Sequence, residues 1–238
     1  ESLVTNNGKG LPEGEHGVYS IDFSKANNEF RNCTTQGNYV DGMPTTGNIN
    51  VLVIPVEFKD ITAASRYGDP SVAISNIDRA FNSDSIENHF SVAQYYYLSS
   101  YSKLNLNFDV LDKWYTTKEN YQYYATGAGA YIDYYDYTLQ NGELNILEEL
   151  LTTLDLEGVD LSKYDSDGNG FIDAVVMINT LDPLLYLNAS DEEYEDYELN
   201  WAFRYYNMLF EDDDYIYHNH NEAAMDYLWA SYSFLMET

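Results

Sequence analysis

The stretch that decides the fold is Asn50-Val51-Leu52-Val53-Ile54-Pro55-Val56-Glu57-Phe58. It is apolar almost throughout, and valine and isoleucine predominate in it. A continuous apolar run of this length and composition predicts a strand that is buried on both faces. Pro55 has no backbone N–H to donate, so it predicts a strand edge or a bulge at that point.

Helices and further strands are predicted beyond this run. Apolar residues at helical spacing predict helices over residues 70–81, 85–99 and 143–154. Strict alternation predicts a half-buried strand over residues 104–110, which residues 113–117 can extend, and apolar runs predict strands over residues 172–180 and 227–236. Because these elements show no regular strand–helix–strand period, we expect an α+β fold with a mixed β-sheet flanked by helices.

Two regions differ in character along the chain. Residues 1–48 are rich in Gly, Asn and Thr and contain Pro12 and Pro44, which predicts an irregular N-terminal extension. Residues 49–238 are then expected to form one partial domain. The chain begins with Glu1 rather than Met, so we expect a trimmed or mature segment.

The charge of the chain excludes several partners. Its 238 residues contain 11 Lys and Arg against 40 Asp and Glu, a formal net charge of −29. Such a chain cannot neutralise a row of phosphates, which argues against DNA, RNA and anionic membranes as partners. No stretch approaches the ~18 apolar residues of a membrane span, so no membrane insertion is expected. Cys33 is the single cysteine and cannot form a disulfide within the chain.

The acidic loop Asp165-Ser166-Asp167-Gly168-Asn169-Gly170-Phe171-Ile172-Asp173 predicts a calcium site. Calcium takes six to eight hard oxygen ligands. We expect these from the side chains of Asp165, Asp167, Asn169 and Asp173 and from the backbone carbonyl of Phe171. The twelfth position, where an EF-hand has a bidentate Glu, is Val176, so further ligands must come from elsewhere or from water. The alternative is an Asp-Gly-Asn turn without an ion.

Two other patterns have weaker chemical meaning. His218 and His220 lie on the same side of any extended segment and could chelate a transition metal, although a solvated polar loop explains them as well. The 25 tyrosines either replace Phe in strands or form a polymer-binding surface, because Tyr pairs an apolar ring with a polar tip.

The order of the motifs resembles the immune inhibitor A family of secreted zinc metallopeptidases. Residues 51–60 are similar to the opening strand of that family, and residues 91–104 to its helix with paired tyrosines and Ser-Tyr-Gly-Lys-like turn, with Ser102 at the usual Gly position. Residues 113–115 fit the next strand. Residues 158–173 match the loop that is taken to bind calcium there. This resemblance implies a zincin-like fold, secretion and peptide-bond hydrolysis, with a protein or peptide as the substrate of the full-length form.

One departure from the family bears directly on activity. Its zinc site is a helix carrying H-E-x-x-H, in which two His bind the metal and Glu activates water. None of the four His residues of this sequence begins that motif. The resemblance therefore implies the N-terminal half of a zincin-like domain, inactive alone, with zinc only in a longer form. It also implies a substrate-pairing edge strand at residues 226–236, with Tyr227, Trp229 and Ser231 as candidate contacts; an ordinary strand in the middle of the sheet is the alternative.

A second function from another class is also open at this point. The same loop and the many tyrosines are compatible with a calcium-dependent module that binds polysaccharide or peptide through a Tyr-rich surface. A glycosidase that uses two of the forty carboxylates is a variant of this alternative. The sequence leaves it open, because that mechanism depends on the distance between the two carboxylates, which only a structure gives.

Overall fold

The computed structural model describes residues 43–83, 90–134, 137–140, 142–168, 171–190, 194–206 and 224–235. The strands are β1 (Gly47–Glu57), β2 (Leu104–Val110), β3 (Tyr115–Thr116), β4 (Tyr131–Tyr134), β5 (Tyr137–Gln140), β6 (Ile172–Asn179), β7 (Phe203–Tyr206) and β8 (Ala224–Ser231). The α-helices are α2 (Ala63–Tyr67), α3 (Pro70–Asn82), α4 (Val92–Ser99), α5 (Tyr121–Ala125), α6 (Gly142–Leu156) and α7 (Pro183–Leu187). The 3-10 helices of the described residues are η1 (Leu161–Tyr164), η2 (Tyr194–Asn200) and η3 (Tyr232–Leu235).

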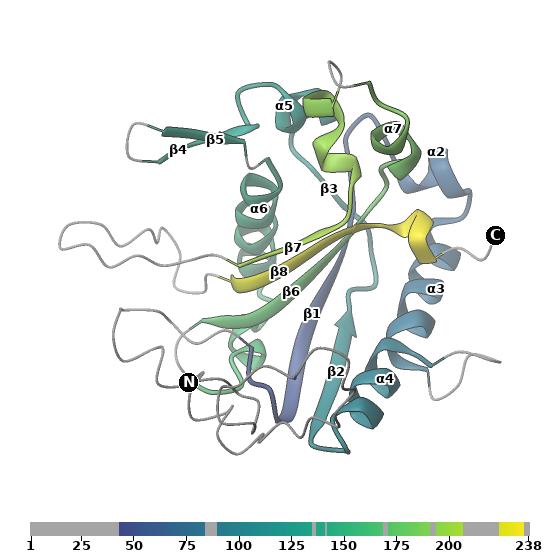
Figure 1. The fold of residues 1–238 in the computed structure, drawn as a ribbon, viewed down its shortest axis with the longest axis vertical. Coiled ribbons are helices and arrows are strands. Elements are labelled where there is room, and N and C mark those ends of the chain that lie inside the picture. The colour runs from purple at the N-terminus through teal and green to yellow at the C-terminus, as the bar shows by residue number, and fades with distance from the viewer. Residues whose placement is uncertain are drawn as a thin grey trace, which may run out of the picture. The chain divides into compact units, whose positions relative to one another are not determined.

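The predicted mixed sheet flanked by helices is confirmed. Six strands form the sheet in the order β2-β1-β6-β8-β7, and the short β3 pairs with β1 beyond the end of β2. Every pairing is parallel except that of β7 with β8. Helices α3 and α4 lie along one side of this sheet and α6 along the other, while the β4–β5 hairpin extends beyond α6 (Figure 1).

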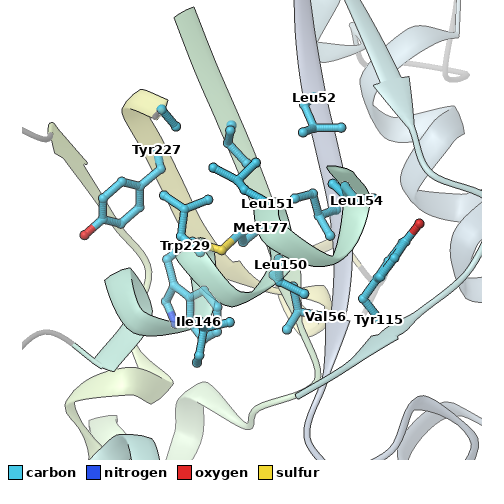
Figure 2. Packing of buried hydrophobic residues seen from close by; sticks show 14 of the residues in the cluster. Leu52, Val56, Tyr115, Ile146, Leu150, Leu151, Leu154, Met177, Tyr227 and Trp229 are labelled. Atoms are coloured by element: carbon cyan, nitrogen blue, oxygen red, sulfur yellow. The ribbon is translucent and has the colours of Figure 1, made fainter. Parts of the chain in front are cut away.

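Strand β1 supplies side chains to both faces of the sheet. Leu52, Ile54 and Val56 pack in the core that α6 covers, whereas Val51 and Val53 pack in the core that α3 covers. Figure 2 shows the first of these cores, where Leu150 and Leu154 of α6 lie among side chains of the sheet. Burial on both faces explains why the sequence of this strand is continuously apolar rather than alternating.

The first part of β1 is polar on the face that α6 covers further along the strand, because Asn48 and Asn50 alternate in step with Leu52 and Ile54. Asn105 and Asn107 of β2 donate from Nδ2 to the Oδ1 atoms of Asn48 and Asn50, each at 3.0 Å. The two pairs follow the parallel register of β1 and β2, in which Asn48 lies opposite Asn105 and Asn50 opposite Asn107. We call these four side chains the asparagine ladder.

Several predicted boundaries change for identifiable reasons. The helix predicted over residues 85–99 begins at Val92, because the Ser91 hydroxyl accepts from Gln94 N and caps it; residues 84–89 lie outside the described part of the chain. The strand predicted to end at Met236 ends at Ser231 and continues as η3, with the Ser231 hydroxyl accepting from Ser233 N. Pro55 lies in the sheet interior, where the neighbour of β1 changes from β2, last paired at Val53, to β3, first paired at Val56.

Among the described residues, no helix combines the length and the apolar character needed to cross a bilayer.

Candidate metal centre

Contacts with two sheet strands fix the segment that leads into the acidic loop. Asn50 on β1 donates from Nδ2 to the carbonyl oxygen of Lys163 at 2.9 Å. The buried Tyr164 donates from its hydroxyl to Asp109 Oδ2 on β2 at 2.8 Å, and Lys163 pairs with the same oxygen at 2.5 Å. Helix η1 therefore presents Asp165 from a position that is anchored to β1 and β2.

Two hydrogen bonds close the loop itself. Gly168 N donates to Asp165 Oδ1 and Ser166 N donates to Asp173 Oδ2, both at 2.8 Å. Gly168 has a φ of +73°, a left-handed conformation that glycine adopts without steric cost. The turn brings one ligand oxygen from each of Asp165, Asp167 and Asp173 to within 4.8 Å of one another.

Asp173 is the buried member of this acidic cluster. It is the second residue of β6 and only 1% exposed. Its Oδ1 atom is buried without a hydrogen-bond partner in the described structure, whereas Oδ2 accepts from Ser166. Burial raises the pKa of Asp173, while hydrogen bonding to Ser166 opposes that rise and the nearby charge of Asp165 adds to it. A buried carboxylate oxygen that lacks a donor is suited to bind a cation.

The donor set fits calcium better than zinc. The described cluster contains carboxylate oxygens alone, which are the hard ligands that calcium prefers, whereas structural zinc sites use Cys or His. Three carboxylates so close together repel one another, and a divalent cation would remove that repulsion. Other protein oxygens or water must complete a coordination number of six to eight.

The remaining predicted ligands have a mixed outcome. Phe171 is half-buried and directly precedes β6, so its carbonyl stays a predicted ligand. Asn169 lies outside the described residues, as do His218 and His220, and the three stay sequence predictions.

The prediction of a substrate-pairing edge strand at residues 226–236 is wrong. β8 lies between β6 and β7, and Tyr227 and Trp229 have register partners on both sides. Tyr227, Trp229 and Ser231 are at most 1% exposed, so an added peptide strand cannot reach them. The chain returns from β6 through β7 and only then forms β8, so β7 becomes the outer strand among the described residues.

Sequence reasoning also missed the residues that support the loop. Asp109 gives no local signal apart from its place in the alternating strand β2, and its role depends on a residue 55 positions away. Its pKa is lowered by the hydrogen bonds from Lys163 and Tyr164, which outweigh the opposing effect of burial. Asp109 therefore stays ionised and holds η1 to the sheet.

No protein-family model matches this chain, and a search of curated proteins also finds no match. The resemblance to the immune inhibitor A family is thus a prediction from the residues quoted above.

Proposed function

We propose that this chain is a calcium-stabilised portion of a secreted metallopeptidase, in which the ion joins the end of η1 to the central strand β6. The observation that carries the calcium site is the buried, unpartnered Oδ1 of Asp173 inside a cluster of three carboxylates. A proton or a cation must offset the charge of this cluster in the folded protein. Calcium does so at neutral pH and supplies ligand bonds in place of the missing hydrogen bond.

The role of the ion is structural. β6 lies at the centre of the sheet between β1 and β8, and the loop is the covalent link between η1 and this strand. A ligand that binds only the folded chain stabilises it by about 2.7 kcal/mol at a hundredfold excess over its dissociation constant. Calcium is therefore expected to control the stability of the whole described domain.

The peptidase assignment rests on the resemblance of the quoted motifs, and these motifs lie in or beside regular elements of the fold. Residues 51–60 form most of β1, residues 91–104 form α4 and the turn into β2, and residues 158–173 form η1, the acidic loop and the start of β6. The printed sequence has no H-E-x-x-H, so zinc-activated water and peptide-bond hydrolysis are proposed only for a longer form of the protein.

Calcium binding can be tested directly on this chain. Tyr164 precedes the loop, so terbium bound there should give tyrosine-sensitised luminescence that calcium displaces. Asp173→Asn keeps the shape of the side chain but removes its charge, and we expect at least a tenfold loss of calcium affinity by calorimetry. Asp112→Asn, an exposed acidic residue outside the loop, is the matched control and should bind calcium normally.

The same preparation tests the proposed inactivity. With calcium and zinc present, we expect no hydrolysis of fluorescent casein above the buffer rate. Hydrolysis that co-purifies with the chain and is removed by a zinc chelator would contradict the proposed inactivity of this chain alone. An Asp173→Asn variant with unchanged calcium affinity and unchanged melting in chelator would contradict the calcium site.

A further inference from the structure

Helix α4 exposes aromatic side chains that a folded domain ordinarily buries. None of its residues is buried, whereas α3 on the same side of the sheet buries Ala73, Ile77 and Phe81. The exposed large side chains on α4 and the segments beside it are Phe90, Tyr95, Tyr96, Tyr97, Leu98 and Tyr101. We call these six residues the α4 surface. Several large exposed side chains on one short helix and its flanks make this region a candidate interaction site.

The turn after α4 holds its most exposed member outward. Tyr101 and Ser102 have φ values of +57° and +63°, and they are the only non-glycine residues with positive φ in the described chain. This left-handed conformation costs roughly 1 kcal/mol or more for each such residue. Ser102 N donates to Tyr97 O at 2.8 Å, which ties the turn to the helix while Tyr101 remains 83% exposed. A left-handed residue closed by such a bond is a common end of an α-helix, and here this end leaves the ring of Tyr101 in solvent.

The α4 surface is nearly free of charge in a strongly acidic chain. The sequence from Phe90 to Phe108 contains no Asp or Glu, and Lys103 is its only charged residue. A cationic partner would gain more where the 40 acidic residues are denser. A polyanion, or a second copy of this chain, would be repelled by the net charge of −29. The surface therefore fits an uncharged partner.

We propose that the α4 surface binds an uncharged polysaccharide. Four of its six side chains are tyrosines, which offer ring faces to the apolar C–H faces of sugar rings and hydroxyl groups to sugar hydroxyls. Tyr95 and Tyr96 meet edge to face, with ring centroids 5.4 Å apart, so together they present a ring face and a ring edge. An anionic lipid bilayer fits less well, because the net charge of −29 is repelled by its headgroups.

Retention on insoluble polymers tests this proposal. The full chain, with calcium present, is incubated with microcrystalline cellulose, chitin and granular starch, and with pectate as the polyanionic comparison. We expect retention on at least one uncharged polymer, little dependence on salt, and no retention on pectate. Tyr101→Ser should weaken binding about tenfold, and Tyr95→Ser combined with it about a hundredfold, because each lost ring removes a stacking contact.

The matched control is Leu184→Ser, which removes an exposed apolar side chain on α7, outside the α4 surface. It should bind as the unchanged chain does. Since the substituted tyrosines are exposed, all variants should melt within a few degrees of one another.

Retention on none of the uncharged polymers, or equal retention of the tyrosine variants, would overturn the proposal. Tyrosine-dependent binding to phosphatidylcholine vesicles, or a tyrosine-dependent dimer in light scattering, would overturn it too and reassign the surface. The α4 surface shares no residue with the acidic loop. Polymer retention therefore tests the polysaccharide proposal and calcium affinity tests the calcium site, and either proposal can be refuted without the other.

Discussion

The hydroxyl of Tyr227 on β8 donates a hydrogen bond to Glu143 Oε1 in the first turn of α6, at 3.1 Å. Both residues are buried. This hydrogen bond joins α6, which covers one face of the sheet, to β8, which lies between β6 and β7 inside the sheet. Burial raises the pKa of Glu143 from 4.5 to about 7, although hydrogen bonds from its own backbone and from Tyr227 oppose the rise.

Glu143 should make the free energy of unfolding depend on pH. Because its pKa is higher in the folded state, the folded state binds the proton more tightly, and the resulting stabilisation is present below about pH 4.5 and lost as the pH rises through about 7. A difference of this size corresponds to about 3 kcal/mol. We expect Glu143→Gln to be the more stable form at pH 8 and to lose most of its advantage at pH 4.5, in urea unfolding with saturating calcium. Parallel pH profiles for the two proteins would refute this role.

Calcium affinity should fall as the pH is lowered. The raised pKa of Asp173 means that its proton competes with the ion at a higher pH than for an ordinary carboxyl group. Calorimetry in two buffers with different ionisation enthalpies, at pH 5, should show protons released on binding. Fewer protons should be released as the pH rises, so the apparent enthalpy should depend less on the buffer at pH 8.

Alanine substitutions at two glycines can separate a change in calcium affinity from a general loss of stability caused by an unfavourable backbone conformation. Gly168 and Gly158 both have left-handed φ values, +73° and +79°, and an added Cβ would meet no atom within 4 Å at either. Alanine at each position should lower the free energy of unfolding in chelator by about 1 kcal/mol. Only Gly168→Ala should also weaken calcium binding, because Gly168 N closes the loop on Asp165. Equal calcium affinities of the two variants would show that the turn does not shape the site.

The packing of α6 can be tested with two leucines of the same helix. Leu150 is buried in the core of Figure 2, whereas Leu156 at the end of the helix is 83% exposed. Leu150→Ala removes buried methyl groups and leaves a cavity, so we expect a loss of about 3 kcal/mol in urea unfolding. Leu156→Ala should change the free energy of unfolding by less than about 0.5 kcal/mol. Similar losses in both variants would contradict the observed orientation of α6.

The elements that the sequence predicts well are those with a strong local pattern. The alternation in residues 104–110 matches β2, and the leucine spacing in residues 143–154 lies within α6. The acidic loop is also local, since a nine-residue stretch supplies the clustered carboxylates.

Features that depend on distant partners were not predictable in this way. The interior place of β8 follows from pairing with β6 and β7, and a strand sequence does not reveal how many neighbours it will have. The raised pKa of Glu143 follows from its burial, and its hydrogen-bond partner Tyr227 lies 84 residues away. The exposure of α4 reverses the usual expectation for apolar residues at helical spacing, because packing against α3 and β2, rather than hydrophobicity, decides which side chains are covered.

The asparagine ladder has a consequence for how the strands find their alignment. A strand that is apolar on both faces could shift by one residue against its neighbour and still bury hydrophobic side chains. Hydrophobic burial alone therefore does not specify the register of such a strand. The amide groups pair twice in the observed register, where Asn48 meets Asn105 and Asn50 meets Asn107; a one-residue shift breaks both pairs, and a two-residue shift breaks one of them. The four asparagines thus favour one register of β1 against β2, which the apolar residues of β1 alone would not specify.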